Sequence, residues 1–240
     1  MRRRAVEVTL AMGALLASFT SSEAQIREGP GGFFGVSFVA ADAVGELGAF
    51  VDQGYGLQFG VAAPAAANGR VRIRADFGFL IYGLERQRLC DGWFGCRVGS
   101  DLTTTNSILY GGIGPELVLA TGMIEPYVHA SAGLSYFLTT SSLDDNDGFG
   151  SYLETTNYSD LVYSWKAGAG IRLRVGNGHR PVFLDFGVER HDNGVANFLT
   201  VGDIVDYDDG SIGVFPNRSE ANLVTFRMGV SIGFPSRRDR

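Results

Sequence analysis

Residues 71–83 (VRIRADFGFLIYG) carry charges at every second position inside a run that is otherwise apolar or glycine. The charged positions are Arg72, Arg74 and Asp76. A β-strand sends alternate side chains to opposite faces, so this stretch predicts a strand with one apolar face and one charged face. Such a strand folds stably only where its two faces meet different surroundings, and this requirement constrains the whole chain.

Alternation of this kind recurs along the sequence and is more prominent than helical spacing. We expect eight strands, at residues 32–41, 53–63, 70–84, 105–120, 123–140, 160–176, 180–191 and 222–234. Most of these segments reach the roughly 9–11 residues with which a tilted strand crosses a membrane. The sequence therefore predicts an all-β protein.

The connections between the predicted strands alternate in length. Short turns rich in Gly, Asn and Pro are expected at residues 64–69, 121–122 and 177–179. Long segments lie at residues 42–52, 85–104, 141–159 and 192–221. Outer-membrane barrels have short periplasmic turns and long external loops. The pattern predicts a single eight-stranded antiparallel up-and-down transmembrane β-barrel in the cell outer membrane, with both termini periplasmic.

Alternate residues of each predicted strand form two faces. One of these faces carries no charge, and the other combines glycine with polar residues. Six cations and five carboxylates on the polar face nearly balance. Eight strands leave an interior only wide enough for side chains, and buried charges must pair to offset desolvation. We expect Arg72 and Arg74 to pair with Asp76 or Glu116. The predicted lumen network consists of Arg72, Arg74, Asp76, Glu116, Glu125, His129, Lys166, Arg172, Arg174, Asp185, Glu189 and Arg227.

The apolar face would contact lipid, where Arg or Lys at the membrane midplane costs about 2–4 kcal/mol. Aromatic side chains collect at the two membrane interfaces of such barrels. Outward aromatic residues near the long-loop ends of their strands predict an aromatic girdle at Tyr55, Tyr136, Tyr163 and Trp165.

Residues 1–24 have the pattern of a secretory signal peptide, with a basic start, a short apolar core at residues 8–17 and small residues before Gln25. Residues 25–240 would form the barrel domain. Cleavage leaves 17 basic and 24 acidic residues, so the formal net charge becomes −7. Net acidity without a Lys/Arg cluster predicts no nucleic-acid partner.

The two cysteines, Cys90 and Cys96, lie in one predicted long loop. In an exported chain they predict a local disulfide. A metal site is less favoured, because no second Cys pair or His partner lies nearby.

An acidic segment at residues 143–154 partly matches a calcium loop through Asp145, Asp147 and Glu154. Leu143 stands where the first ligand should be, and no flanking helices are expected. A solvated loop that attracts divalent cations near lipopolysaccharide phosphates is the favoured interpretation. We expect no cofactor.

The chain resembles the small eight-stranded outer-membrane β-barrels of the outer-membrane protein A, X and W type over residues 30–234. Four features carry the resemblance: the signal peptide, the alternation of short and long connections, the separation of apolar and polar residues onto opposite strand faces, and the last strand, LVTFRMGVSIGF. The resemblance implies that Phe234 is recognised by the outer-membrane assembly machinery. It also implies contact with membrane lipid and lipopolysaccharide, and we expect a monomer.

We expect a structural or surface-interaction role without catalysis. A narrow pore or carrier for small apolar molecules is the alternative, since the inner face is rich in glycine. A lipid A-modifying enzyme is a further alternative. Barrels of the deacylase type carry a His-x-Ser-Asn motif. The comparable stretch here, residues 189–194 (ERHDNG), has the His and the Asn but an Asp where the nucleophilic Ser should be. His129, Glu125 and Ser131 are interpreted as part of the lumen, not as a triad.

Overall fold

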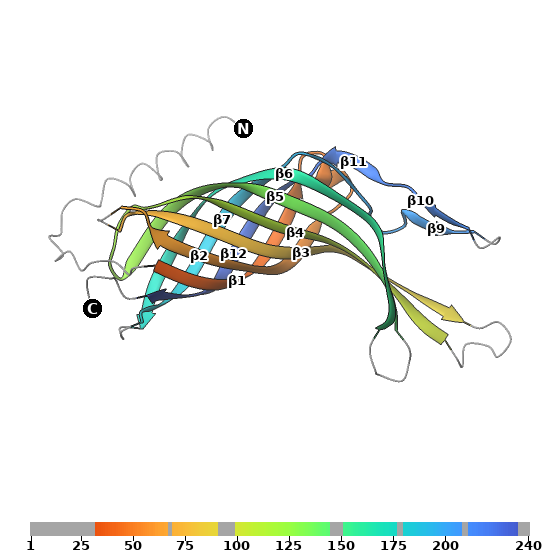
Figure 1. Cartoon of the computed structure of the whole chain (residues 1–240), viewed down its shortest axis with the longest axis horizontal. Coiled ribbons are helices and arrows are strands. Elements are labelled where there is room, and N and C mark those ends of the chain that lie inside the picture. The colour runs from red at the N-terminus through yellow and green to blue at the C-terminus, as the bar shows by residue number, and fades with distance from the viewer. Residues whose placement is uncertain are drawn as a thin grey trace, which may run out of the picture.

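The structure, a computed structural model, describes residues 32–66, 69–90, 99–144, 151–176, 180–207 and 211–234. Eight antiparallel strands close into one barrel in the order β1-β12-β7-β6-β5-β4-β3-β2 (Figure 1). The predicted fold class is confirmed. The barrel strands are β1 (Gly32–Val44), β2 (Gln53–Pro64), β3 (Val71–Cys90), β4 (Gly99–Val118), β5 (Ile124–Asp144), β6 (Ser151–Gly176), β7 (Val182–Asn193) and β12 (Asn222–Phe234).

The remaining elements belong to the long connections at one end of the barrel. They are η1 (Leu47–Ala49), β8 (Val195–Phe198), β9 (Ile204–Asp206), β10 (Ile212–Val214) and β11 (Asn217–Glu220). β8 pairs with β11, and β9 pairs with β10. Among the described residues, no helix is long and apolar enough to cross a membrane.

Strands β3 to β6 continue well beyond the predicted strand ends. β3 runs to Cys90, β4 starts at Gly99, β5 runs to Asp144 and β6 starts at Ser151. The expectation of irregular loops at residues 85–104 and 141–159 is therefore wrong for most of these residues. Backbone pairing between neighbouring strands continues past the apolar belt, where Ser and Thr replace apolar side chains and no apolar face marks a strand. The four strands project from the barrel as a sheet (Figure 1).

The barrel is inverted relative to a water-soluble protein. Large apolar side chains on the outside are exposed on all eight barrel strands, for example Phe77 at 53 % and Met228 at 59 %. Arg72 and Glu116, in contrast, are fully buried in the interior. Alternate residues of each strand thus separate into an apolar outer surface and a charged inner one, as the strand parity predicts.

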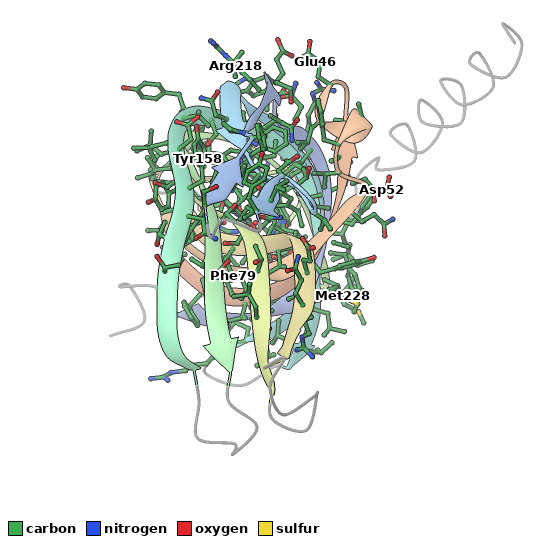
Figure 2. The ribbon with its side chains drawn as sticks, turned by 90° about the vertical axis from the view of Figure 1, so that its right-hand side faces the viewer. Glu46, Asp52, Phe79, Tyr158, Arg218 and Met228 are labelled. Atoms are coloured by element: carbon green, nitrogen blue, oxygen red, sulfur yellow. The ribbon has the colours of Figure 1, made fainter. Side chains whose placement is uncertain are left out.

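An apolar cluster fills the interior at the long-loop end of the barrel, the end that faces the viewer in Figure 2. Phe198 of β8 packs edge-on against Phe50 beside η1, with ring centroids 5.8 Å apart, and also contacts Phe137 at 6.1 Å. The Tyr82 hydroxyl donates a hydrogen bond to the Leu199 carbonyl at 3.1 Å. Segments predicted as plain external loops therefore insert apolar side chains into the barrel mouth and cover it.

A smaller apolar cluster lies at the short-turn end. Phe33 of β1 and Phe183 of β7 pack edge to face at 5.3 Å, with Ala62 beside them. The lumen is thus layered, with the ionic residues between two apolar ends. The sequence analysis predicted polar residues and glycine on the inner face and missed the apolar residues at both ends of the barrel. Residues close to a mouth can pack against inserted loop side chains or neighbouring aromatic rings.

Inner-face glycines make room for two large tyrosines. Tyr127 lies opposite Gly170 in the β5–β6 ladder, and Tyr110 lies opposite Gly78 in the β3–β4 ladder. A Cβ atom at Gly170 would lie closer to the Tyr127 hydroxyl than normal contact distance and 2.7 Å from the Phe186 carbonyl oxygen. Only glycine at this position lets the ring lie flat across the neighbouring strand.

We expect Gly170→Ala to destabilise the barrel by about 1–3 kcal/mol, because the added methyl group displaces the Tyr127 ring or the adjacent backbone. Reversible urea unfolding of the protein in lipid vesicles measures the change. Gly176→Ala on the same strand is the control, since its new Cβ would lie at least 3.4 Å from its neighbours. Equal stability of the two variants would contradict the packing described for Tyr127.

Candidate functional site: the ionic lumen

Glu116 of β4 is the centre of the buried ionic network. Its carboxylate accepts hydrogen bonds from Arg72 Nη1 at 3.3 Å, from Arg74 Nη1 at 3.1 Å and from Arg172 Nη1 at 2.8 Å. Arg72 and Arg74 come from β3, one strand away, whereas Arg172 comes from β6 on the other side of β5. Three guanidinium groups on one fully buried carboxylate form an arrangement whose attraction offsets part of their desolvation.

A second group of charges surrounds Asp76 and Glu189. Asp76 accepts from Arg74 Nε at 2.9 Å and from Gln58 Nε2 at 3.2 Å, and Lys166 Nζ lies 3.8 Å from it. Glu189 pairs with Arg227 at 2.7 Å and with His129 Nε2 at 3.0 Å.

Asp76, His129 and Glu189 offer ligand atoms within 4.8 Å of one another. The arginines and lysine that already contact the two carboxylates supply positive charge at this position. The geometry therefore supports an ion-pair network and not a cation site.

Tyr127 joins the two groups. Its hydroxyl donates to Asp185 Oδ1 at 2.5 Å and accepts from Arg227 Nη2 at 2.9 Å. Its ring lies under the Arg172 guanidinium, 4.0 Å from centroid to Cζ. Arg172 Nε also lies 3.3 Å from Asp185. One aromatic side chain thus contacts charges from three strands by hydrogen bonding and by cation–π attraction.

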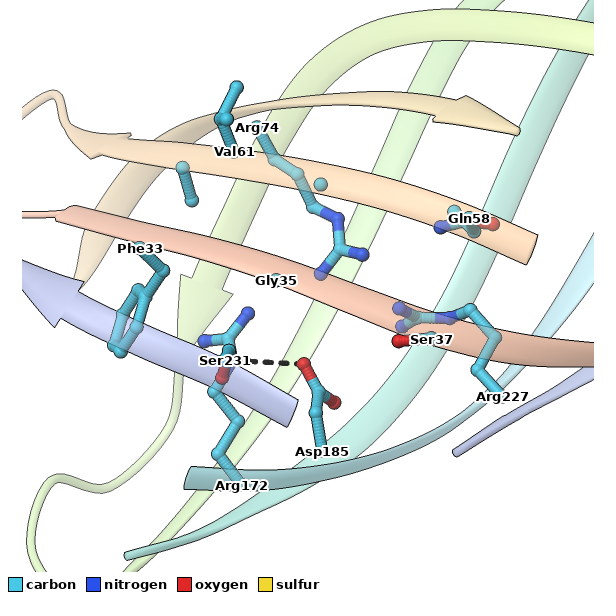
Figure 3. Close-up of a pocket in the computed structure, with 12 residues that line it drawn as sticks. Phe33, Gly35, Ser37, Gln58, Val61, Arg74, Arg172, Asp185, Arg227 and Ser231 are labelled. Atoms are coloured by element: carbon cyan, nitrogen blue, oxygen red, sulfur yellow. Dashed lines mark hydrogen bonds and ion pairs between the residues drawn. The ribbon is translucent and has the colours of Figure 1, made fainter. Parts of the chain in front are cut away.

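A small cavity of about 20 Å³ lies beside this group (Figure 3). Arg74, Arg172, Arg227 and Asp185 line it together with Ser231. A second cavity of about 10 Å³ lies within the apolar cluster near Leu80 and Phe137. Each has room for about one water molecule, so the described lumen is filled by side chains.

The structure places all of the predicted lumen residues on the inner face. All twelve take part in hydrogen bonds or ion pairs. These include Lys166 with Asp76 at 3.8 Å and Arg174 with Glu125 at 3.5 Å, nearer the short-turn end. His129 bonds Glu189 and not Glu125. The inner-face position of Glu125, His129 and Ser131 thus does not bring them together as a triad.

Two large lumen residues, Tyr110 and Tyr127, were missed by the sequence reasoning. Tyr127 shares its parity with Glu125 and His129, which were predicted to face the lumen. The signal that could have found the tyrosines is the glycine opposite each of them in the neighbouring strand. That signal requires the strand register, which the sequence alone does not provide.

His191, in the stretch compared with a lipid A deacylase motif, also faces the lumen. His191 Nε2 lies 3.2 Å from Ser135 Oγ of β5, so the fold supplies a hydroxyl that is absent from the neighbouring sequence. Both side chains are buried inside the barrel, where Ser135 lies opposite Tyr110 in the β4–β5 ladder and the Tyr110 and His191 rings lie 5.2 Å apart. A lipid bound to the outer surface would not reach this pair.

The predicted girdle residues Tyr55, Tyr136, Tyr163 and Trp165 are all exposed on the outer face. The predicted disulfide stays a prediction, because Cys96 lies outside the described residues and only the backbone of Cys90 is described. The calcium candidates Asp145 and Asp147 also lie outside them, as does the side chain of Glu154. The predicted signal peptide falls in residues 1–24, which the structure does not describe.

No protein-family model and no curated protein matches the chain. Solved structures are similar in fold. Neisserial surface protein A is 12 % identical with a TM-score of 0.45, and the match covers 85 % of this chain and 97 % of that one. Ail, the attachment invasion locus protein of Yersinia pestis, is 11 % identical with a TM-score of 0.46, and the match covers 86 % of this chain and 100 % of that one. A major outer membrane protein from Thermus thermophilus is 14 % identical with a TM-score of 0.36, and the match covers 85 % of this chain and 99 % of that one.

Proposed function

We propose that this protein is an integral outer-membrane barrel with a structural or surface-contact role, without catalysis and without transport. The observation that carries the proposal is the inversion of the barrel. An apolar belt surrounds it, while ten buried Asp, Glu, Lys and Arg side chains of the described residues face the lumen. A continuous exposed apolar belt on this scale is unfavourable in water and stable in lipid.

The filled lumen supports a non-conducting role over a pore or a carrier. The ionic network occupies the middle of the described barrel, and the Phe198 cluster covers the long-loop end. The cavities of about 20 and 10 Å³ are too small for a carried molecule. The buried position of the Ser135–His191 pair supports a role without catalysis.

The projecting part of β3 to β6 supports a role in surface contact. β2 pairs with β3 only as far as Ile81, so residues 83–90 pair with β4 on one side. A strand edge of this kind can pair with an extended segment of another protein. In our proposal this sheet extends from the cell surface and both termini lie in the periplasm, because Gly32 pairs with Phe234 at the short-turn end.

Migration of unboiled and boiled samples on a denaturing gel tests the proposal. We expect the unboiled, folded barrel to migrate differently from the boiled chain, and the protein to fractionate with outer membranes. Protease added to intact cells should cleave within the long connections. Recovery of the chain in soluble periplasmic extract would refute the proposal, and conductance steps in planar bilayers would refute the non-conducting role.

A further inference from the structure

The lumen cavity of about 20 Å³ is lined by three guanidinium groups, which Figure 3 shows around it. They belong to Arg74 of β3, Arg172 of β6 and Arg227 of β12. Asp185 is the one carboxylate among the described residues that line the cavity. The uncharged polar side chains of the lining are Ser37, Gln58 and Ser231. Three cations and one carboxylate therefore border the same small space.

The ionic network around this cavity has one cation more than it has carboxylates. Its Arg and Lys side chains number six and its Asp and Glu side chains number five, and all of them face the lumen. Protonation of a lumen histidine would only add positive charge. The excess is visible at Asp76, which Arg74 contacts at 2.9 Å and Lys166 at 3.8 Å. An uncompensated cation inside the barrel is unfavourable because it has lost its hydration.

The lining of the cavity also has hydrogen-bond donors to spare. Ser231 is 3 % exposed, and its hydroxyl has no hydrogen-bond partner among the described residues. A guanidinium group has five N–H donors, and the contacts of Arg227 with Glu189 and with the Tyr127 hydroxyl use two of them. A buried hydroxyl and spare guanidinium donors around one space suit a ligand that only accepts hydrogen bonds.

The size of the cavity selects among such ligands. It has room for about one water molecule, so it excludes phosphate, sulfate and the carboxylate groups of larger molecules. A water molecule would satisfy the Ser231 hydroxyl and leave the charge of the network unbalanced. We propose that the cavity binds one chloride ion, which accepts from Ser231 and the neighbouring guanidinium groups and completes the charge balance of the lumen.

Urea unfolding in lipid vesicles tests the proposal when sodium gluconate is replaced stepwise by sodium chloride at constant total salt. Gluconate is too large for the cavity, and constant salt keeps the screening of surface charges unchanged. A ligand that binds only the folded state lowers the unfolding equilibrium constant, and at about 200 mM chloride we expect at least a fivefold decrease that saturates. Equal unfolding in the two salts would overturn the proposal.

Two serine variants separate the cavity from general effects of the salt. Ser231→Ala removes the hydroxyl that lines the cavity, so several times more chloride should be needed for the same stabilisation. Ser131→Ala is the matched control, because Ser131 is also buried, its hydroxyl also has no partner among the described residues, and it does not line the cavity. A chloride effect that is the same in both variants would contradict binding at this site.

Lys166→Met tests the role of the excess charge. Lys166 does not line the cavity, so the substitution removes one cation of the network and leaves the lining unchanged. We expect the chloride effect to disappear, since five cations and five carboxylates would then balance. Persistence of the full effect in Lys166→Met would refute charge compensation.

Bromide locates the ion directly, because it has the same charge as chloride, is only slightly larger and scatters X-rays anomalously. Crystals of the unchanged protein grown with sodium bromide should give an anomalous peak among Arg172, Arg227 and Ser231, and crystals of Ser231→Ala a weaker one. A cavity with a water molecule and no anomalous signal would overturn the proposal.

Discussion

Glu116→Gln is expected to lower the free energy of unfolding by about 3–5 kcal/mol, because it removes one partner from a buried ionic network. The substitution preserves the shape of the side chain and removes its charge. Arg72, Arg74 and Arg172 would each lose a charged acceptor in the middle of the lumen. Urea unfolding of the barrel in lipid vesicles, followed by fluorescence and by gel shift, measures the loss.

A double substitution separates loss of charge balance from loss of packing. Glu116→Gln together with Arg72→Met should be less damaging than the sum of the single changes, since one unpaired guanidinium is removed as well. Asp192→Asn is the control for a peripheral pair, because Arg190 is exposed to solvent or headgroups and its loss of partner should leave stability nearly unchanged. Strict additivity of the Glu116 and Arg72 changes would show that the lumen charges do not interact as described.

Phe77→Arg is expected to destabilise the barrel in lipid by about 2–4 kcal/mol, because it places a cation on the face that we propose contacts lipid, near the middle of β3. Phe77 pairs with Phe59 of β2, about halfway along the shared ladder, and both rings face outward. The substitution would cost little if this face were in contact with water. The measurement is the free energy of unfolding in vesicles, together with the fraction of protein that inserts during refolding.

Met123→Arg provides the matched comparison for Phe77→Arg. Met123 is 78 % exposed in the short turn between β4 and β5, outside the paired part of the strands. The cost of an arginine falls to about 0–1 kcal/mol near the membrane interface. Equal effects of the two substitutions would contradict the orientation proposed for the barrel in the membrane.

Much of the barrel could be predicted because the side-chain period of a strand is a local property. The parity of β3 directs Arg72, Arg74 and Asp76 inward and Phe77 outward, and the same rule holds on the other seven strands. The extended ends of β3 to β6 could not be predicted this way. Strand pairing there depends on neighbouring backbones, and the Ser- and Thr-rich sequence shows no apolar alternation.

The composition of the candidate site was predictable, and the predicted pairing of Arg72 and Arg74 with Glu116 and Asp76 is confirmed. The contacts between strands that are not neighbours were not predictable. Glu116 and Arg172 are 56 positions apart and lie on strands that are not neighbours. Their contact depends on the stagger and tilt of the closed barrel, which bring inward side chains of separate strands to one height. The insertion of Phe198 depends likewise on the path of a long connection, which the parity rule does not describe.

The sequence by itself determined that 71–83 is a two-faced strand, that seven further segments resemble it and that charges gather on one of their faces. Alternation along a strand is enough for these conclusions, because it follows from backbone geometry alone. Only the tertiary structure decided that Glu116 bonds three arginines and that Tyr127 joins Asp185 to Arg227. These arrangements require the register of each strand pair and the closure of the barrel, since each of them joins residues from at least three separate segments of the chain.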